Sequence, residues 1–362
     1  MQWRAGLPRV KSLRVRAVRV PLDEPHRTAS GVITESPLVL TDLLTEAGSG
    51  HSLVFTYTAA ALKPTAELIR NLEPLVAGER LAPGEIEQKL SKRFRLLGPQ
   101  GLVGIALAAI DMALWDALAR MNGMSLVQLL GFEPKPVRAY GAIGYDGAAG
   151  SAKVAEQWAA QGFSGVKAKI GYPSVAEDLA VVREVRRAVG GGMAIMVDYN
   201  QCLTPAEAVQ RLRVLDGEGL TWIEEPTLAH DFAGHSRVAR EIATPIQCGE
   251  NWWGTLDLQH ALDAGACDFV MLEAMKIGGV SGWLRAAGMA HARSIPVSNH
   301  LWPEISAQLL CCTPTAHWLE YARWWNPVLE HPLRIEKGMA EVDGILGTGV
   351  EWNEAAVDRF LA

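Results

Sequence analysis

Three carboxylate residues recur at an even spacing in the second half of the chain. Asp198, Glu224 and Glu250 are 26 residues apart each time, and each lies at or just beyond the end of a short apolar run. If those runs are neighbouring parallel strands, about 4.8 Å apart, the three carboxylates converge on one point. Clustered anions repel one another unless they are protonated or bridged by a cation. Each residue alone would be interpreted as salt-bridged or helix-capping, but the even spacing of an all-oxygen set favours a Mg²⁺ site over a zinc site.

Two lysines precede this set. Lys167 and Lys169 are two residues apart in the apolar run GVKAKI, so in a strand they point to the same face. Taken alone, the pattern is typical of a half-buried strand with a solvated lysine face. On a strand next to the three carboxylates, the lysines instead project towards the metal site. Burial and a second cation both disfavour the charged form, which predicts a lowered pKa and a general-base role for one of them.

A histidine and two further carboxylates end later runs. His300 ends a run on the far side from the lysines, and Glu273 ends the run before it. An isolated histidine is more often a polar group of the core, but an adjacent carboxylate orients and charges an imidazole. A lysine and a histidine that face each other across a metal can remove a proton from either face of one carbon. Glu320 ends the last run and, if protonated, could donate a hydrogen bond to a developing oxyanion.

These residues require a fold that brings the ends of consecutive strands together. From about Val137, short apolar runs alternate with helical patterns, and the residues at their ends are 20 to 29 positions apart: Tyr140, Lys169, Asp198, Glu224, Glu250, Glu273, His300 and Glu320. That period is the length of one strand–loop–helix–loop unit, and eight units favour a closed parallel (β/α) barrel over a doubly wound sheet. Helix starts fit this order, with Thr204 predicted as an N-cap before Pro205 and Thr255 as another N-cap.

The first part of the chain has a mixed pattern. The runs LRVRAVRVPL and PLVLTDLLTEAG predict strands, and residues 104–123 have the apolar spacing of a helix ended by glycine. We therefore expect an α+β domain over residues 1–135, a barrel over residues 136–333, and a C-terminal segment, residues 334–362, that packs back on the first domain.

The composition argues against several classes of protein. The chain has 362 residues, 49% hydrophobic and 20% charged, as in soluble enzymes, and its net charge of −6 gives no reason to expect a nucleic-acid partner. No uninterrupted apolar run approaches the roughly 20 residues that span a bilayer, so no membrane partner is expected. The N-terminus lacks the apolar core of a signal peptide. The five cysteines show no metal-ligand or disulfide spacing, which predicts a cytoplasmic protein.

Several motifs together resemble the enolase superfamily, specifically its mandelate racemase subgroup. In the barrel region they are VKAKIGYP, IMVDYNQ, TWIEEPT, GENWWG, AMKIGGVSGW and NHLWPEISA, and in the first region HSLVF, YTAAALK and IDMALWDAL. They cover essentially the whole chain from about Val15. The resemblance implies an α/β fold in which an N-terminal α+β capping domain covers a modified TIM-type (β/α)8 barrel, (β/α)7β. It also implies Mg²⁺, a small-molecule carboxylate substrate and a homo-oligomer, often an octamer.

The resemblance further implies roles for individual residues. The three evenly spaced carboxylates would be the metal ligands, with Asn200 nearby. Lys169 would be the base on one face of the substrate and His300 the base on the other. Lys167 would neutralise the substrate carboxylate, and Glu320 would act on it as the electrophile. Such a site abstracts the α-proton of a carboxylate through an enediolate, and the expected reaction is racemisation of a 2-hydroxy acid.

The chain departs from the subgroup's pattern at several positions. Ala142 and Ile143 stand where the racemase that names the subgroup has serine and histidine. The stretch EPHRTASGVI is more polar than its counterpart there, with His26, Arg27 and Ser30. These departures leave the substrate open and support dehydration of a sugar acid as the alternative reaction, because a polyol needs polar partners.

Glu273 is a further departure, since the subgroup has aspartate there. We expect its carboxylate to accept a hydrogen bond from the imidazole nitrogen of His300 that faces away from the substrate, which would fix the tautomer. The alternative is that the longer side chain turns aside to a lysine or to solvent and leaves His300 without an orienting partner.

Two other classes of protein are weighed against this hypothesis. A Schiff-base or pyridoxal-phosphate barrel would also use an interior lysine, but it needs no evenly spaced carboxylates, and the late strands are followed by no clear glycine-rich phosphate loop. A non-catalytic binding protein would leave many costly buried charges without a purpose. We therefore expect an enzyme, an isomerase or a hydro-lyase.

Overall fold

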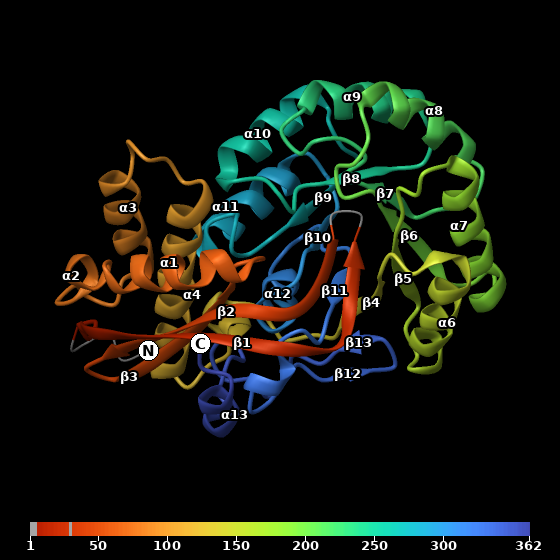
Figure 1. Ribbon diagram of the computed structural model, residues 1–362. Helices are drawn as coiled ribbons and strands as arrows, with labels where there is room; N and C mark the ends of the chain where they lie inside the picture. Colours follow the sequence, from red (N-terminus) through yellow and green to blue (C-terminus); the bar gives the residue numbers. More distant parts are fainter. Residues whose placement is uncertain (1–5, 29–30) are drawn as a thin grey trace.

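The computed structural model describes residues 6–28 and 31–362, and its N-terminal part is a sheet covered by helices (Figure 1). We call this part the capping domain. Its antiparallel strands, in the order β1-β2-β3, are β1 (Val10–Thr28), β2 (Gly31–Thr45) and β3 (Gly48–Phe55). The helices that follow are α1 (Ala59–Arg70), α2 (Glu73–Val76), α3 (Pro83–Arg93), α4 (Gly101–Met121) and α5 (Leu126–Leu129). The predicted strands are confirmed.

Strand β3 packs closely on α4, and the sequence allows this at Gly50. A Cβ at that position would lie 2.1 Å from the carbonyl oxygen of Ala113 and 2.4 Å from the amide nitrogen of Ala117. Any side chain larger than hydrogen would therefore push the sheet away from the helix.

Helix α4 is more apolar than the sequence analysis expects. By length and composition it could span a membrane, with a mean hydropathy of 1.8 over a window that is 78% buried in the protein. The expectation concerned uninterrupted apolar runs, and Asp111 and Asp116 interrupt the run in this helix. Its acidic residues Asp111 and Asp116 are buried and accept hydrogen bonds from Ser281 and Thr348. The helix is the central core element of the capping domain.

Eight parallel strands form the second part. They pair in chain order from β4 to β10, and β11 pairs with β4. The strands are β4 (Val137–Ile143), β5 (Gly165–Lys169), β6 (Ala194–Asp198), β7 (Trp222–Glu224), β8 (Ile246–Cys248), β9 (Phe269–Leu272), β10 (Val297–Asn299) and β11 (Leu319–Tyr321). Backbone hydrogen bonds of 2.8 Å join Val297 to Thr315 and His317, which closes the ring between β10 and the segment entering β11.

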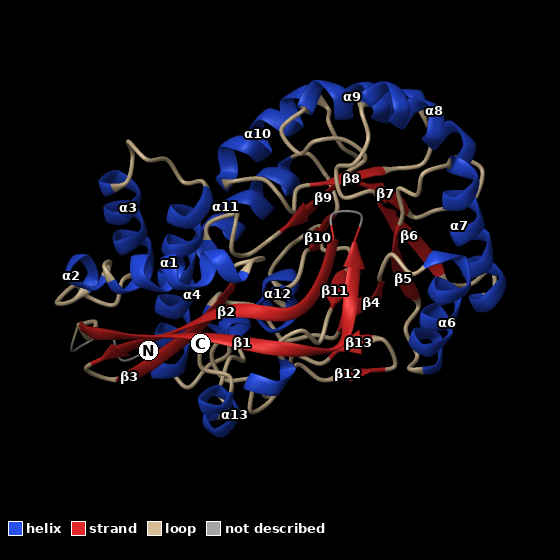
Figure 2. Ribbon diagram, viewed as in Figure 1, coloured by secondary structure: helices blue, strands red, loops and turns tan. Residues whose placement is uncertain are grey.

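A helix follows each of the first seven barrel strands, and Figure 2 shows these helices arranged around the outside of the strands. They are α6 (Gly147–Ala160), α7 (Val175–Val189), α8 (Pro205–Leu215), α9 (Phe232–Glu241), α10 (Gly254–Ala264), α11 (Gly279–Ala292) and α12 (Pro303–Cys311). After β11 the chain enters a short 3-10 helix (Asn326–Val328) instead. The expected (β/α)7β barrel is therefore confirmed.

Of the two predicted helix N-caps, one is confirmed and one is wrong. Thr204 caps α8, with its side chain accepting from the amide of Glu207 and Pro205 in the first turn, as predicted. The predicted cap at Thr255 is wrong, because α10 begins at Gly254 and Trp253 is its N-cap residue. There the first turn is held by the Asp257 carboxylate, which accepts from the Trp253 amide at 2.8 Å.

The C-terminal segment contacts both parts of the protein. Strands β12 (Ile335–Glu336) and β13 (Met339–Ala340) form a hairpin, and β13 pairs antiparallel with the start of β4. After α13 (Glu354–Arg359), the chain end bonds to β1, where the Arg19 amide donates to the Phe360 carbonyl at 2.9 Å and the Ala362 amide to Ala17 at 3.0 Å.

The β1–β2 hairpin reaches from the capping domain across the barrel, and in Figure 1 it rises in front of the barrel strands. The carbonyl of Arg27 accepts from the amide of Tyr145, which lies just after β4, at 2.8 Å. The ring of His26 lies 5.0 Å from that of Trp324, which follows β11. The hairpin therefore covers the carboxyl ends of the barrel strands, where barrel enzymes place their active sites.

Candidate active site

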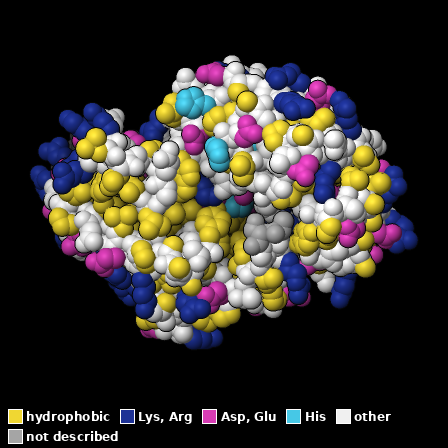
Figure 3. All heavy atoms as spheres, turned by 45° about the horizontal axis from the view of Figure 1, so that its top comes forward, with side chains coloured by type: hydrophobic (Ala, Val, Ile, Leu, Met, Phe, Trp, Pro, Cys, Tyr) yellow, Lys and Arg dark blue, Asp and Glu magenta, His cyan; other side chains and the backbone are white. Residues whose placement is uncertain are grey.

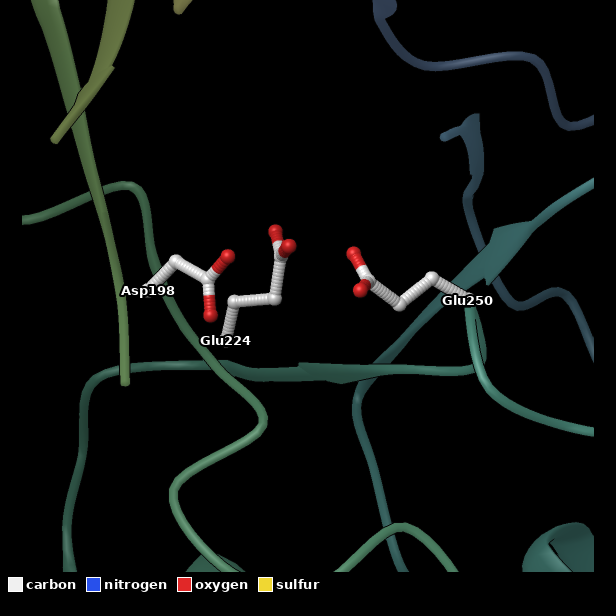
Figure 4. Close-up of side chains that lie close together, drawn as sticks. All are labelled: Asp198, Glu224 and Glu250. Carbon is white, nitrogen blue, oxygen red and sulfur yellow. The ribbon is translucent and has the colours of Figure 1, made fainter. Parts of the chain in front are cut away.

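Three carboxylates meet at the carboxyl ends of neighbouring barrel strands. Asp198 and Glu224 are the last residues of β6 and β7, and Glu250 comes two residues after β8. All three are buried, and ligand atoms from the three lie within 4.8 Å of one another. Figure 4 shows the carboxylates turned towards a common space. These are the three residues that the sequence analysis predicts to converge on one metal site.

This triad fits Mg²⁺. The donors are all oxygen, and Glu250 Oε2 has no hydrogen-bond partner among the described residues. Asp198 is oriented by Asn200. The backbone amide of Asn200 donates to Asp198 Oδ1 at 2.7 Å, and its side-chain Nδ2 donates to Oδ2 at 3.1 Å. Burial and the neighbouring anions raise the pKa of Glu224 well above its usual range. A hard dication would relieve that repulsion, and buried carboxylates are the ligands that Mg²⁺ prefers.

Both lysines of β5 point into the barrel. Lys167 and Lys169 are 1% and 7% exposed, so the interpretation of a solvated lysine face is wrong. Lys167 Nζ lies 2.6 Å from Glu224 Oε1 and 2.9 Å from Glu320 Oε1. Lys169 forms an ion pair with Asp198. The two lysines therefore address different carboxylates, although they share one strand face.

The protonation of the lysines differs from the prediction. Burial alone would lower their pKa values, but the surrounding carboxylates outweigh it. Glu224 and Glu320 raise the pKa of Lys167 well above its usual range, and Asp198 raises that of Lys169. The prediction of a lowered lysine pKa neglected that Asp198 lies directly against the amine. Asp198 is the carboxylate that raises the pKa of Lys169 most, so a cation bound at the triad would offset that effect and make the amine a better base.

On the opposite side, His300 lies directly after β10 and Glu273 directly after β9. The His300 Nδ1 atom lies 2.6 Å from Glu273 Oε2, so the expected dyad is formed despite the longer side chain. His300 Nε2 faces the triad, 3.4 Å from Glu250 Oε2. Against the effect of burial, Glu250 and Glu273 raise the pKa of His300. Glu273 Oε2 also lies 3.4 Å from Lys276 Nζ, so the carboxylate does contact a lysine, as the alternative proposed, but it keeps its contact with His300.

Glu320 lies within β11, between the two sides. Its Oε1 accepts from Lys167, and its Oε2 accepts from the Leu301 amide at 3.1 Å and lies 3.9 Å from His300 Nε2. Burial is outweighed by the charges of Lys167 and His300, and the pKa of Glu320 falls to about 2. The expectation of a protonated Glu320 is therefore not met in this structure, where the carboxylate is an acceptor.

The lysines and the histidine flank the triad from opposite ends. Lys169 is bound to Asp198, the first triad residue, and His300 approaches Glu250, the last. Around the closed ring, the strand that carries Lys169 and the strand that precedes His300 are separated by β6 to β9 on the triad side and by β4 and β11 on the other side. The arrangement places two groups that can carry a proton on either side of one metal position.

The sequence analysis missed several residues of the site. Two of them, Tyr57 and Lys276, contact the carboxylate of Glu273. Lys276 also donates to Asn251, which in turn donates to Glu225. Three of them stand in quoted motifs of the barrel, TWIEEPT, GENWWG and AMKIGGVSGW, and Tyr57 stands in YTAAALK of the capping domain. The motifs were therefore visible, but nothing in the spacing showed that these four side chains meet.

A cavity of about 620 Å³ lies between the hairpin and the β4–α6 loop, lined by residues that include His26, Arg27, Ala142 and Trp324. Figure 3 shows a hollow between the two parts of the protein. Partial burial, with the charge of Lys169, lowers the pKa of His26 to about 3, so this imidazole is neutral. Arg27 instead lies 3.8 Å from Asp146. Ser30 lies outside the described residues.

The sequence matches two known family domains. Residues 10–131 match the mandelate racemase / muconate lactonizing enzyme N-terminal domain, and residues 150–356 match the enolase C-terminal domain-like family. The chain belongs to the enolase superfamily, in its mandelate racemase subgroup. This family shares the barrel and the capping domain described above.

Known relatives carry several activities. A solved structure of an enolase from Bradyrhizobium, complexed with magnesium and mandelic acid, superposes with a TM-score of 0.94 at 41% identity, covering 98% of this chain and 99% of that one. The L-talarate/galactarate dehydratase of Salmonella typhimurium is 30% identical over 72% of this chain and 66% of its own length. The D-galactarolactone cycloisomerase of Agrobacterium fabrum is 28% identical over 97% of this chain and 98% of its own length.

Magnesium is bound in the Bradyrhizobium structure and in that of an L-talarate dehydratase from Polaromonas, and the buried triad of this chain is compatible with it. The family member described here is therefore a magnesium enzyme, an isomerase or a lyase.

Proposed function

We propose that this enzyme abstracts the α-proton of a small carboxylate through an enediolate and racemises a 2-hydroxy acid. The observation that carries the proposal is the placement of Lys169 and His300 at opposite ends of the carboxylate triad. Racemisation needs one group to remove a proton from one face of a carbon and another to return a proton to the opposite face. Two such groups, each with its own carboxylate partner, support this reaction.

In the proposed mechanism, Lys169 takes the proton of one enantiomer and His300 Nε2 that of the other. Glu273 accepts at Nδ1, so Nδ1 carries the hydrogen and Nε2 is the free position on the side of the triad. Mg²⁺ held by the triad would polarise the substrate carboxylate and stabilise the charge of the enediolate. Lys167 lies beside Glu320 and adds a fixed positive charge at the same place.

The barrier explains why so many charges surround the reacting carbon. An α-proton beside a carboxylate is far less acidic than the conjugate acid of any side-chain base. Groups that interact more strongly with the enediolate than with the substrate lower the barrier by that difference. Lys167 is well placed for this, because it is buried and held on two sides by Glu224 and Glu320.

Dehydration of a sugar acid is the second candidate. His300 would then deliver a proton to a leaving hydroxyl instead of to carbon. The specific observation in its favour is the imidazole of His26, which lines the cavity between the hairpin and the β4–α6 loop and can exchange hydrogen bonds with a hydroxyl. The similarity to L-talarate/galactarate dehydratase agrees with it.

The deciding experiment follows the α-proton by NMR in deuterated water with Mg²⁺ present. Mandelate and other 2-hydroxy acids are compared with a panel of sugar acids, each as a pure stereoisomer. Racemisation predicts deuterium in both substrate and its enantiomer, with no keto acid formed. Formation of a 2-keto-3-deoxy acid would establish dehydration, and no exchange with any carboxylate would refute proton abstraction.

A further inference from the structure

The carboxylate of Glu273 is held by three partners that converge on one oxygen, two through hydrogen bonds and one through an ion pair. Glu273 Oε2 lies 2.6 Å from His300 Nδ1, 2.6 Å from the hydroxyl of Tyr57 and 3.4 Å from Lys276 Nζ. Its other oxygen, Oε1, is buried and has no hydrogen-bond partner among the described residues. The contacts are thus concentrated on the oxygen that the imidazole uses.

One of these donors comes from the capping domain. Tyr57 follows β3 and has a φ of 58°, in the left-handed region that non-glycine residues seldom adopt. The residue as a whole is 39% exposed, but its hydroxyl reaches into the barrel. Such a backbone conformation persists only where the surroundings determine it. In this backbone conformation the Tyr57 hydroxyl can reach Glu273.

The ion-pair partner, Lys276, is itself held by a second set of contacts. Its ammonium donates to Asn251 Oδ1 at 2.8 Å and lies 4.5 Å from the centre of the Tyr57 ring, a cation–π distance. Asn251 in turn donates to Glu225 at 2.7 Å. The side chain is 7% exposed, so it is largely shielded from solvent. Tyr57 and Lys276 therefore support each other as well as the carboxylate.

A glutamate needs such support more than an aspartate does. It has one more rotatable bond, and ordering that bond costs free energy that a single hydrogen bond from an imidazole barely offsets. A buried carboxylate with one donor is also poorly solvated. Without other donors, Glu273 would populate rotamers that leave Nδ1 of His300 unpaired.

We infer that Tyr57 and Lys276 are positioning residues that clamp Glu273 on His300, so that the capping domain takes part in the proton transfer on the histidine face. The inference rests on the proposed function, in which His300 carries the proton on one face. It assigns no contact with substrate to either residue. It predicts that the clamp affects one of the two proton transfers and spares the other.

The test uses Tyr57→Phe and Lys276→Met in the full-length enzyme with Mg²⁺. Deuterium exchange is followed separately from each enantiomer of the 2-hydroxy acid that the wild type turns over best. Loss of an outer partner of this kind costs about 10-fold to 10²-fold on the histidine face. Exchange on the Lys169 face should stay within about 2-fold, as for sites without shared partners. Lys89→Met, at an exposed ion pair with Glu79, is the matched control and should change neither rate.

A second measurement does not depend on activity. Histidine labelled with ¹⁵N, assigned with His300→Asn, reports the tautomer and the hydrogen-bonded Nδ1 proton of His300. In the wild type we expect a single tautomer with a downfield proton, and in both clamp variants a mixture or a proton that exchanges with water. An unchanged His300 spectrum in both variants, or equal damage to both exchange rates, would overturn the inference.

The two proposals can fail separately. If the wild type exchanges no α-proton, the proposed function is wrong, while the ¹⁵N spectra still decide whether Tyr57 and Lys276 orient the imidazole. If the wild type exchanges both enantiomers and the clamp variants lose both equally, the function stands and the clamp is refuted. Circular dichroism of each variant checks that the fold is retained.

Discussion

The lysine side and the histidine side of the site are built from different parts of the molecule. On the lysine side, Lys167 and Lys169 share β5, and their partners Asp198 and Glu224 end the next two strands. Among the described residues, the hydrogen bonds and ion pairs of these four side chains all lie within the barrel. On the histidine side, His300 depends on Glu273, and that carboxylate also bonds to Tyr57 of the capping domain.

The difference has a physical origin. Strand geometry alone places i and i+2 side chains on one face and sets neighbouring strands about 4.8 Å apart. A lysine pair on such a strand meets the next strand's carboxylates without help. Glu273 and His300 leave their strands just after the last paired residue, so their side chains are oriented by packing and by donors from elsewhere. We expect the histidine side to be the more sensitive to changes outside the barrel.

The largest effect should come from the group that serves both sides. Glu224→Gln removes one triad charge, and because Mg²⁺ supplies several kcal/mol of charge stabilisation, both exchange rates should fall by more than about 10³-fold. Chelation of the metal should do the same reversibly. Isotope exchange and titration with Mg²⁺ measure the two effects, with Glu184→Gln, at a surface ion pair with Arg187, as control. Full activity after chelation would contradict the assignment.

The next effect separates the sides. Lys169→Met should abolish exchange of one enantiomer and His300→Asn that of the other, each by about 10² to 10⁴-fold, the usual contribution of a general base. The residual exchange on the intact face is the internal control in each variant. Both faces lost together in both variants would mean that the two residues act through the metal site instead. A dehydratase would show loss of product in both variants with exchange retained in one.

A smaller, one-sided effect is expected at Glu273. In Glu273→Gln the amide cannot carry the charge that attracts the imidazole, and it can donate to Nδ1 and stabilise the wrong tautomer. We expect a loss of about 10 to 10²-fold on the histidine face, typical of an outer partner, and little change on the lysine face. Separate exchange rates for the two enantiomers measure this. An equal loss on both faces would place Glu273 in support of the triad or of the fold.

The smallest effect on chemistry is expected at Asp111, where α4 of the capping domain binds the start of α11. Asp111 accepts from the amide of Ser281 at 3.0 Å and from its hydroxyl at 2.6 Å, and burial raises the pKa of Asp111 to about 7. The native state then keeps a proton that the unfolded chain releases near pH 4. Between about pH 4 and 7 this group makes the free energy of unfolding fall as pH rises, by up to about 1.4 kcal/mol per pH unit.

Asp111→Asn should remove that contribution and make the stability less dependent on pH in this window. Urea unfolding at several pH values measures it, with exchange rates at neutral pH as the control, since neither face contacts Asp111. An unchanged slope would show that Asp111 is ionised in the native protein. A large loss of exchange on the histidine face alone would show that the contact between α4 and the start of α11 also positions Glu273. The histidine side would then depend on the capping domain at a second point.

The sequence by itself determined the barrel, the triad and the lysine pair. Each follows from a local rule: the period of the strand–helix units, the polar residue at each strand end, and the alternation of side chains along β5. The resemblance to the enolase superfamily rests on the same strand-end motifs. These features were predictable because strand pairing carries the local pattern directly into three dimensions.

Only the tertiary structure decided how these groups are charged and held. The raised pKa of Lys169 and the low pKa of Glu320 depend on which side chain lies within about 3 Å, which the order of strands does not show. The contact of Tyr57 with Glu273 joins residues 216 positions apart in two different domains. No periodicity encodes such a contact, because it is set by how the capping domain packs on the barrel.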